Sequence, residues 1–176
     1  MGARDVRIRA RGPDDVDRRL IRSLARLHAE AMQAGMALGA TRETDLEELH
    51  RAALADAGRV VLVAERDDEV VGMAQLVPST AANAPHRAEV QRVAVAQSAR
   101  GTGVGRRLME AVEEAALERG LTLLWLTTHD GSDACAFYEA VGYTRLGEMP
   151  GYSLRPNGTV STGVFYFREL AANVSR

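Results

Sequence analysis

The chain has 176 residues, of which 46% are apolar, and its 22 basic and 24 acidic residues leave a formal net charge of −2. This length and composition predict one domain with a sizeable core, and the balanced charge argues against a nucleic-acid-binding protein. All 22 basic residues are arginine, which excludes a Schiff-base lysine and the lysine of a P-loop. An anionic ligand would therefore be held by main-chain N–H groups and guanidinium side chains.

Cysteine content and hydropathy bear on the expected cellular compartment and on the expected cofactors. The single cysteine, Cys135, excludes an intramolecular disulfide, and no clustered His/Cys pattern suggests a metal site. The sequence shows neither an apolar segment of signal-peptide length at its start nor one long enough to cross a membrane. We expect a cytoplasmic protein with no metal, nucleic-acid or membrane partner, which is a monomer or a homodimer. We expect residues 1–176 to form a single domain.

The first half of the chain predicts two helices and four strands. Pro13 and the acidic pair after it favour the start of a helix, whose apolar spacing continues until Gly35 and Gly39 interrupt it. Asp67-Asp68 lies between two β-branched runs and predicts a hairpin. The expected strands are 6–9, 59–65, 70–77 and 89–95, and the second helix is expected over 41–57.

The second half alternates between helical and extended patterns. After a glycine-rich turn we expect an amphipathic helix that ends near Gly120, and a short helix over 132–141. The expected strands of this half are 121–128, 143–147 and 160–170. An antiparallel meander followed by a βαβ passage gives a mixed α/β chain of the α+β class.

The turn Arg100-Gly-Thr-Gly-Val-Gly105 lies between a β-branched strand and an amphipathic helix. Glycines let a ligand approach the main chain, and the N–H groups at a helix start favour an anion, so a diphosphate is the natural ligand. An ordinary glycine-rich turn is the alternative. A P-loop would need a lysine at Arg106, and a dinucleotide-binding fingerprint would need wider glycine spacing in an early βαβ unit.

Two motifs resemble those of the GNAT superfamily of N-acetyltransferases. Arg100 to Gly105 fits its Arg/Gln-x-x-Gly-x-Gly/Ala motif, and Ala134 to Tyr143 fits its short helix with a Phe-Tyr pair followed by Gly-aromatic. The segment Arg87 to Leu170 further resembles the tabtoxin resistance protein and its relatives. It carries Thr127 where that group has an acid, and Gly131 where the superfamily often has asparagine.

The resemblance implies a fold and a cosubstrate. The fold would be a mixed, mostly antiparallel sheet of about seven strands, splayed into a V and flanked by about four helices. Acetyl-CoA would lie in the opening, with its pantetheine arm on Val93, Ala94 and Val95 and with Ser132 and Phe137 nearby. Its diphosphate would bind the turn formed by Arg100, Gly101, Thr102, Gly103, Val104, Gly105 and Arg106.

Three residues are candidates for catalysis. Tyr138 matches the superfamily's tyrosine that protonates the leaving sulfur, although it could also be a core aromatic. Glu89 is the candidate base or substrate contact, and the alternative is a solvent-facing strand residue or a partner of Arg87 or Arg92. His129 has a pKa suited to proton transfer, although a surface-loop histidine is the alternative.

Other residues have weaker expectations. Cys135 has no neighbouring base in the sequence and is expected to be a packed thiol rather than a nucleophile. The cluster Met32, Met36 and Leu38 could line an acceptor pocket or fill the core, and Tyr152 could form a pocket rim.

The resemblance thus implies an N-acetyltransferase that moves acetyl from acetyl-CoA to a primary amine of a small, amino-acid-like or antibiotic-like molecule. The amine would attack directly in a ternary complex. The alternatives are an acyltransferase for a protein or peptide amine, and a CoA-binding module with little catalysis.

Overall fold

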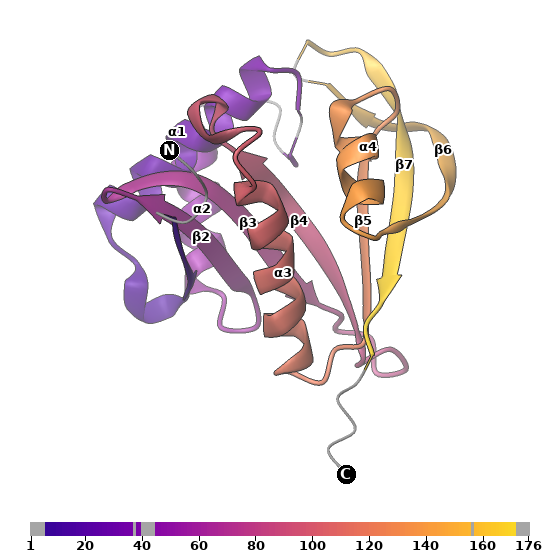
Figure 1. The fold of residues 1–176 in the computed structure, drawn as a ribbon, viewed down its shortest axis with the longest axis horizontal. Coiled ribbons are helices and arrows are strands. Elements are labelled where there is room, and N and C mark those ends of the chain that lie inside the picture. The colour runs from indigo at the N-terminus through magenta and orange to yellow at the C-terminus, as the bar shows by residue number, and fades with distance from the viewer. Residues whose placement is uncertain (1–5, 37, 40–44, 156, 172–176) are drawn as a thin grey trace.

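The computed structural model describes residues 6–36, 38–39, 45–155 and 157–171. Its strands are β1 (Arg7–Arg11), β2 (Val60–Arg66), β3 (Glu69–Pro78), β4 (Arg87–Val95), β5 (Leu123–His129), β6 (Thr144–Leu154) and β7 (Val160–Glu169). Its helices are α1 (Arg18–Gln33), α2 (Leu46–Ala55), α3 (Val104–Leu117) and α4 (Asp133–Ala140), with short 3-10 turns at Pro13–Asp15 and Gln97–Ala99. Figure 1 shows their arrangement.

One seven-stranded sheet runs through the molecule in the order β1-β2-β3-β4-β5-β7-β6. Every neighbouring pair is antiparallel except β4 and β5, which are parallel. The predicted class and the seven-stranded, four-helix fold are therefore confirmed. Asp67 and Asp68 close the β2–β3 hairpin with positive φ angles of 50° and 62°, as a tight hairpin turn requires.

The two parallel strands pair only where they begin. Three residue pairs join β4 to β5, and the last is Glu89 with Trp125. Beyond that pair the strands separate, and Figure 1 shows β4 and β5 diverging toward the start of α3 and toward α4. β4 is also irregular at this point, because its register with β3 shifts between Met73 and Gln75 and Arg92 has a φ of +51°. The sheet is thus splayed in its middle.

Helices cover both faces of the sheet. A Cβ at Gly72 of β3 would meet Leu108 of α3 at 2.8 Å, so the missing side chain lets α3 pack closely on that face. α1 packs on β3 and β4 and against α2, and Figure 1 shows this pair behind the sheet while α3 and α4 lie in front. Aliphatic side chains from both faces form the core.

Two local expectations need correction, and a third falls outside the described residues. Pro13 starts a separate 3-10 turn, and α1 begins five residues later because Asp17 caps it, accepting from the N–H groups of Arg19 and Leu20 at 2.7 and 2.9 Å. β6 continues beyond the expected residue 147 to Leu154, because its pairing with β7 resumes after an irregularity. The expected start of the second helix at Thr41 lies outside the described residues, which show α2 from Leu46.

Among the residues that the structure describes, no helix is long and apolar enough to span a membrane.

Candidate active site

The predicted site residues lie on β4, on β5 and on the segments that follow these two strands, on both sides of the β4–β5 opening. The main-chain edge of β4 that faces β5 is unpaired beyond Glu89, because the ladder stops there. Val93, Ala94 and Val95 follow on this edge, and the 3-10 turn and the glycine-rich turn come next. An extended ligand can therefore add along this edge as a strand would.

The glycine-rich turn presents main-chain donors at the start of α3. Gly101 and Gly103 have φ angles of 72° and 90°, which favour glycine, and Gly103 is the N-cap. In the described chain, the first N–H after the turn that has a main-chain acceptor belongs to Arg107, which donates to Gly103 at 3.2 Å. The N–H groups of residues 101–106 are thus available to an anion at the positive end of a 14-residue helix.

Gly105 has a different role from the other two glycines. A Cβ at this position would lie 3.1 Å from the ring of Phe137 on α4. The glycine lets α4 pack against the first turn of α3, and this contact brings Phe137 beside the turn. The sequence motif of three glycines therefore combines two positions that need a positive φ with one that needs close packing.

The polar side chains around the turn are engaged with the protein. Thr102 Oγ1 donates to the Ala99 carbonyl at 2.7 Å, which holds the turn in shape. Arg100 Nε donates to the Val95 carbonyl at 3.1 Å, and Arg106 Nη2 donates to the Ala140 carbonyl at 3.0 Å. The two arginines thus connect the turn to the end of β4 and to the end of α4, and they add positive charge on both sides.

Tyr138 lies on α4 in a cluster of aromatic rings and is 7% exposed. Its ring centroid is 5.3 Å from that of Phe137, 6.1 Å from that of Tyr143 and 5.9 Å from that of Tyr166. Burial, and to a lesser extent Cys135, raises the pKa of Tyr138 well above 10. The phenol is therefore protonated at neutral pH and can serve as a donor.

Glu89 is half-buried on β4 at the last rung that joins β4 to β5. Its Oε2 accepts a hydrogen bond from Gln91 Nε2 at 2.8 Å. The hydrogen-bond partner of Glu89 is therefore Gln91 rather than Arg87 or Arg92. One carboxylate oxygen is thus held in place.

His129 ends β5, four residues beyond Trp125, the rung partner of Glu89. At about 3.3 Å of rise per residue this separates the two residues by on the order of 13 Å along the strand direction. His129 Nδ1 lies 2.9 Å from Ser161 Oγ, and partial burial and Arg155 lower the pKa of His129. The structure therefore does not bring Glu89 and His129 together as a pair.

The remaining α4 residues contact the end of β5. Ser132 Oγ donates to the His129 carbonyl at 2.7 Å, and Cys135 Sγ lies 3.4 Å from the same carbonyl oxygen. Cys135 is half-buried against these groups and has no imidazole or carboxylate partner among the described hydrogen bonds, as expected for a packed thiol.

A cluster of polar side chains beside the β4 irregularity went unnoticed in the sequence. Gln75 on β3 is completely buried, and its Oε1 accepts from Arg59 Nη1 at 2.7 Å and from Arg92 Nη1 at 2.6 Å. His28 of α1 and His50 of α2 are also fully buried, with His28 Nδ1 3.1 Å from His50 Nε2. The sequence shows several polar residues within apolar strands, but it does not show that their side chains meet in the folded protein.

Two other expectations concerned the acceptor side. Met32 is 5% exposed, and Met36 and Leu38 are partly buried against the core, so filling of the core accounts for them. Tyr152 of β6 is 40% exposed and its ring lies over Gly163 and edge-on to Phe165 at 5.1 Å. It covers the β6–β7 hairpin.

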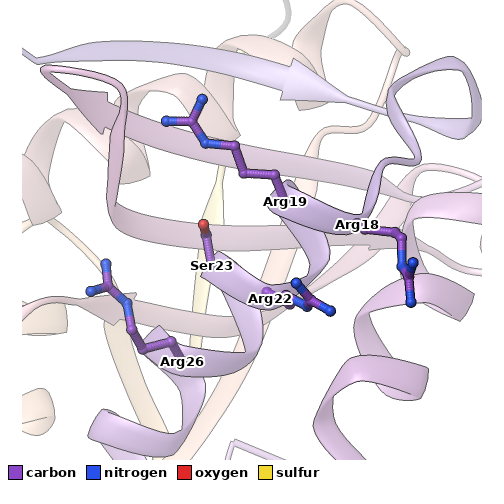
Figure 2. A pocket seen from close by; sticks show the side chains of 5 residues that line it. All are labelled: Arg18, Arg19, Arg22, Ser23 and Arg26. Carbon is purple, nitrogen blue, oxygen red and sulfur yellow. The ribbon is translucent and has the colours of Figure 1, made fainter.

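A surface hollow lies outside this region, on the exposed side of α1. Figure 2 shows that Arg18, Arg19, Arg22, Ser23 and Arg26 line it, all from this one helix. Arg19 donates to the Asp68 carbonyl at 3.2 Å and Arg22 lies 4.0 Å from Glu47. With no second element closing over it, this hollow is a solvated helix face.

Throughout the described residues, no three His, Cys, Asp or Glu side chains gather as metal ligands would.

Comparison with known proteins agrees with this geometry. The family described as "Acetyltransferase (GNAT) family" matches residues 22–143. A curated relative, N-alpha-acetyltransferase 80 of Mus musculus, is 48% identical over 79 residues, which are 45% of this chain and 23% of the relative. The chain thus spans about a quarter of that protein's length.

Solved structures share the whole fold. A ribosomal-protein-alanine N-acetyltransferase from Brucella melitensis is 28% identical with a TM-score of 0.76, covering 93% of this chain and 99% of that one. An acetyltransferase from Salmonella typhimurium, solved with its cofactor acetyl-CoA, is 19% identical with a TM-score of 0.76, covering 97% of each chain. The second of these likenesses concerns the fold alone.

Proposed function

The chain belongs to the acetyltransferase (GNAT) family of acetyl-CoA-dependent acyltransferases, and on that premise we propose that it acetylates a primary amine of a small, amino-acid-like molecule. We further propose that residues 1–176 act as one catalytic domain. A sheet that is continuous from β1 to β6 supports this.

The observation that carries the proposal is the glycine-rich turn at the open end of the splayed strands. The residues fit acetyl-CoA, because the unsatisfied N–H groups of residues 101–106 match a diphosphate and the unpaired edge of β4 matches the amide groups of a pantetheine arm. In this proposal Gly101 to Arg106 bind the diphosphate, and Val93 to Val95 bind the pantetheine. Phe137 and Ser132 border the ligand from α4.

The chemistry needs little beyond orientation and two proton transfers. The lone pair of the acceptor amine attacks the thioester carbonyl carbon, the C–S bond breaks, and the amine loses one proton while the sulfur gains one. Glu89 accepts the amine proton, directly or through water, and Tyr138 donates a proton to sulfur. The raised pKa of Tyr138 supports a donor that is fully protonated before the step.

His129 remains an alternative base. It lies at the open end of β5, and a lowered pKa favours the neutral imidazole that a base requires. A pH profile of kcat/KM for Glu89→Gln and for His129→Gln separates the two assignments, because only removal of the true base abolishes its titration.

A second candidate acceptor is the N-terminal amine of a protein or peptide. The names of the relatives from Mus musculus and Brucella melitensis favour it, since both name N-acetyltransferases and one acts on ribosomal-protein alanine. The motifs of residues 87–170 that resemble tabtoxin resistance proteins are the argument for the small-molecule acceptor, although the comparisons do not show that closeness and this chain has Thr127 where that group has an acid.

Release of free thiol from acetyl-CoA tests the proposal. The purified protein is given free amino acids, aminoglycosides, tabtoxin and peptides with free N-termini, and CoA affinity is measured by calorimetry. Acceleration by a small amine supports the proposal, whereas acceleration by peptides alone supports the second candidate. CoA binding without acceleration by any amine would indicate a binding module, and absence of CoA binding would contradict the central claim.

A further inference from the structure

Two arginines converge on one neutral oxygen beside the splayed strands. Arg59 precedes β2 and Arg92 lies on β4, and both donate to Gln75 Oε1, at 2.7 and 2.6 Å. Arg59 Nη1 also lies 3.2 Å from Gln91 Oε1. We call Arg59 and Arg92 the arginine pair. Two cations that share one amide oxygen leave most of their positive charge without compensation from that group.

The carboxylates around the arginine pair neutralise only part of its charge. Asp56 lies 3.7 Å from Arg59 Nε, and its side chain is half exposed to water. No described carboxylate lies within ion-pair distance of Arg92, whose Nε is buried without a hydrogen-bond partner. Glu89 is directed to Gln91 instead.

The lowered pKa of Arg92 is consistent with this incompletely balanced positive charge. Burial, followed by the charge of Arg59, lowers the pKa of Arg92 to about 10, and Glu89 offsets part of that effect. His50 faces the same region and is neutral, since burial, His28 and Arg92 lower its pKa to about 3. A buried cation that feels a second cation more strongly than the nearest carboxylate gains free energy when an anion approaches.

The position of Arg92 connects this charge to the reaction site. It lies three residues beyond the Glu89 rung and directly precedes Val93, where the proposed pantetheine edge begins. Its φ of +51° is uncommon for a residue other than glycine, and such strain is often kept at functional positions. A Cβ at Gly39 would lie 3.5 Å from Arg92 Nη2, so the guanidinium extends toward the α1–α2 connection and away from α3.

From these observations we infer that the arginine pair binds a carboxylate of the acceptor, so that the acceptor is an amine that also carries a carboxylate. This inference rests on the proposed function and specifies its substrate class. The carboxylate is either the α-carboxylate of a free amino acid or the acidic side chain of a peptide's first residue. Guanidinium groups match it by charge-assisted, two-point hydrogen bonding, which also directs the amine toward the thioester.

Matched acceptors test the inference. We would measure kcat/KM for free amino acids against their carboxamides, and for peptides beginning with Asp against the same peptides beginning with Asn. The expected result is a preference of about 10-fold or more for one carboxylate series, since a hydrogen-bonded charge contributes that much to binding. Which series shows the preference identifies the source of the carboxylate.

Substitution of one arginine assigns the preference to the site. In Arg92→Gln the preference falls to near unity, because KM rises more for the carboxylate acceptor than for the carboxamide. Arg18→Gln, on the exposed face of α1, is the matched control and retains the preference. Thermal denaturation and CoA affinity of each variant exclude misfolding as the cause.

The outcomes separate this inference from the proposed function. Equal use of both members of each pair by the unaltered protein, or a preference that survives in Arg92→Gln, would overturn the inference and leave the acetyltransferase intact. Calorimetry with the same pairs on the CoA-bound protein decides the question for ligands that turn over slowly. Loss of CoA binding would instead count against the proposed function.

Discussion

The proposed coenzyme side and the proposed acceptor side of this molecule are encoded differently in the sequence. The proposed coenzyme residues lie within the segment from Val93 to Phe137, and the backbone conformation of their central turn is visible in the sequence as glycines at fixed spacing. The proposed acceptor side combines Arg59, which precedes β2, with Gln75 of β3 and with Gln91 and Arg92 of β4, and the histidine pair comes from two helices. A site formed by the main chain of one turn can be recognised in the sequence from its glycine spacing. A site formed by side chains from distant segments can be recognised only once the fold is known.

The largest effect is expected on the coenzyme side, at the proposed acid. Tyr138→Phe removes one hydroxyl and keeps the ring, so kcat falls about 100-fold while CoA affinity is unchanged. Steady-state kinetics and calorimetry measure the two quantities. Tyr166→Phe is the control, because its ring lies 5.9 Å away and its hydroxyl donates to Glu139. Equal losses in both variants would assign Tyr138 to packing.

The next effect concerns the turn itself. Gly103→Val places a β-branched residue at a φ of 90°, so the turn must rearrange and the Kd for CoA rises about 10-fold. Calorimetry measures this Kd. Gly147→Val on β6 is the control, because no positive φ and no neighbouring atom within 4 Å oppose its side chain. Unchanged affinity in Gly103→Val would mean that the diphosphate binds elsewhere.

On the acceptor side, the buried histidine predicts a pH dependence of stability. The pKa of His50 is about 3 in the folded protein against an ordinary 6.5, so the unfolded chain binds the extra proton. Its stabilising contribution is complete above pH 6.5 and is lost as the pH falls toward 3, at up to about 1.4 kcal/mol per pH unit. Urea denaturation at several pH values measures the slope.

Substitution isolates this contribution from the carboxylates that titrate in the same range. His50→Gln has a shallower dependence of unfolding free energy on pH than the unaltered protein, while His86→Gln, at an exposed position, keeps the original slope. Identical slopes in all three proteins would contradict a neutral buried His50.

The smallest effect concerns α1, the helix that packs on the proposed acceptor side. Asp17→Ala removes the cap of α1 and lowers the free energy of unfolding by about 1 kcal/mol, with CoA affinity unchanged. Urea denaturation measures the loss, and Asp14→Ala, at an exposed position before the cap, is the control. A loss of CoA affinity in Asp17→Ala would remove the distinction between the two sides.

The sequence predicted the order of strands and helices because apolar periodicity and glycine positions act locally. It predicted the β2–β3 hairpin from Asp67-Asp68, and it placed a helix after Gly105. The extension of β6 to Leu154 was not predicted. Pro150-Gly151 indicated the end of the strand, but pairing with β7 resumes at Ser153 after an irregularity. The hydrogen bond from Gln91 to Glu89 was not predicted, because Arg87 and Gln91 are both two residues from Glu89 on one face of β4 and the sequence does not distinguish between them.

The absence of a side chain at Gly105 bears on the length of the ligand that fits the proposed coenzyme site. Phe137 touches Gly105 with its ring, and the next residue is the proposed acid, so the anion turn and the acid are separated by a single side-chain contact. The packing of α4 on α3 therefore sets the distance between the proposed diphosphate site and the Tyr138 phenol. A larger residue at position 105 would increase this distance. In the proposed complex, the thioester on the pantetheine arm would then no longer reach the phenol while the diphosphate is bound to the turn.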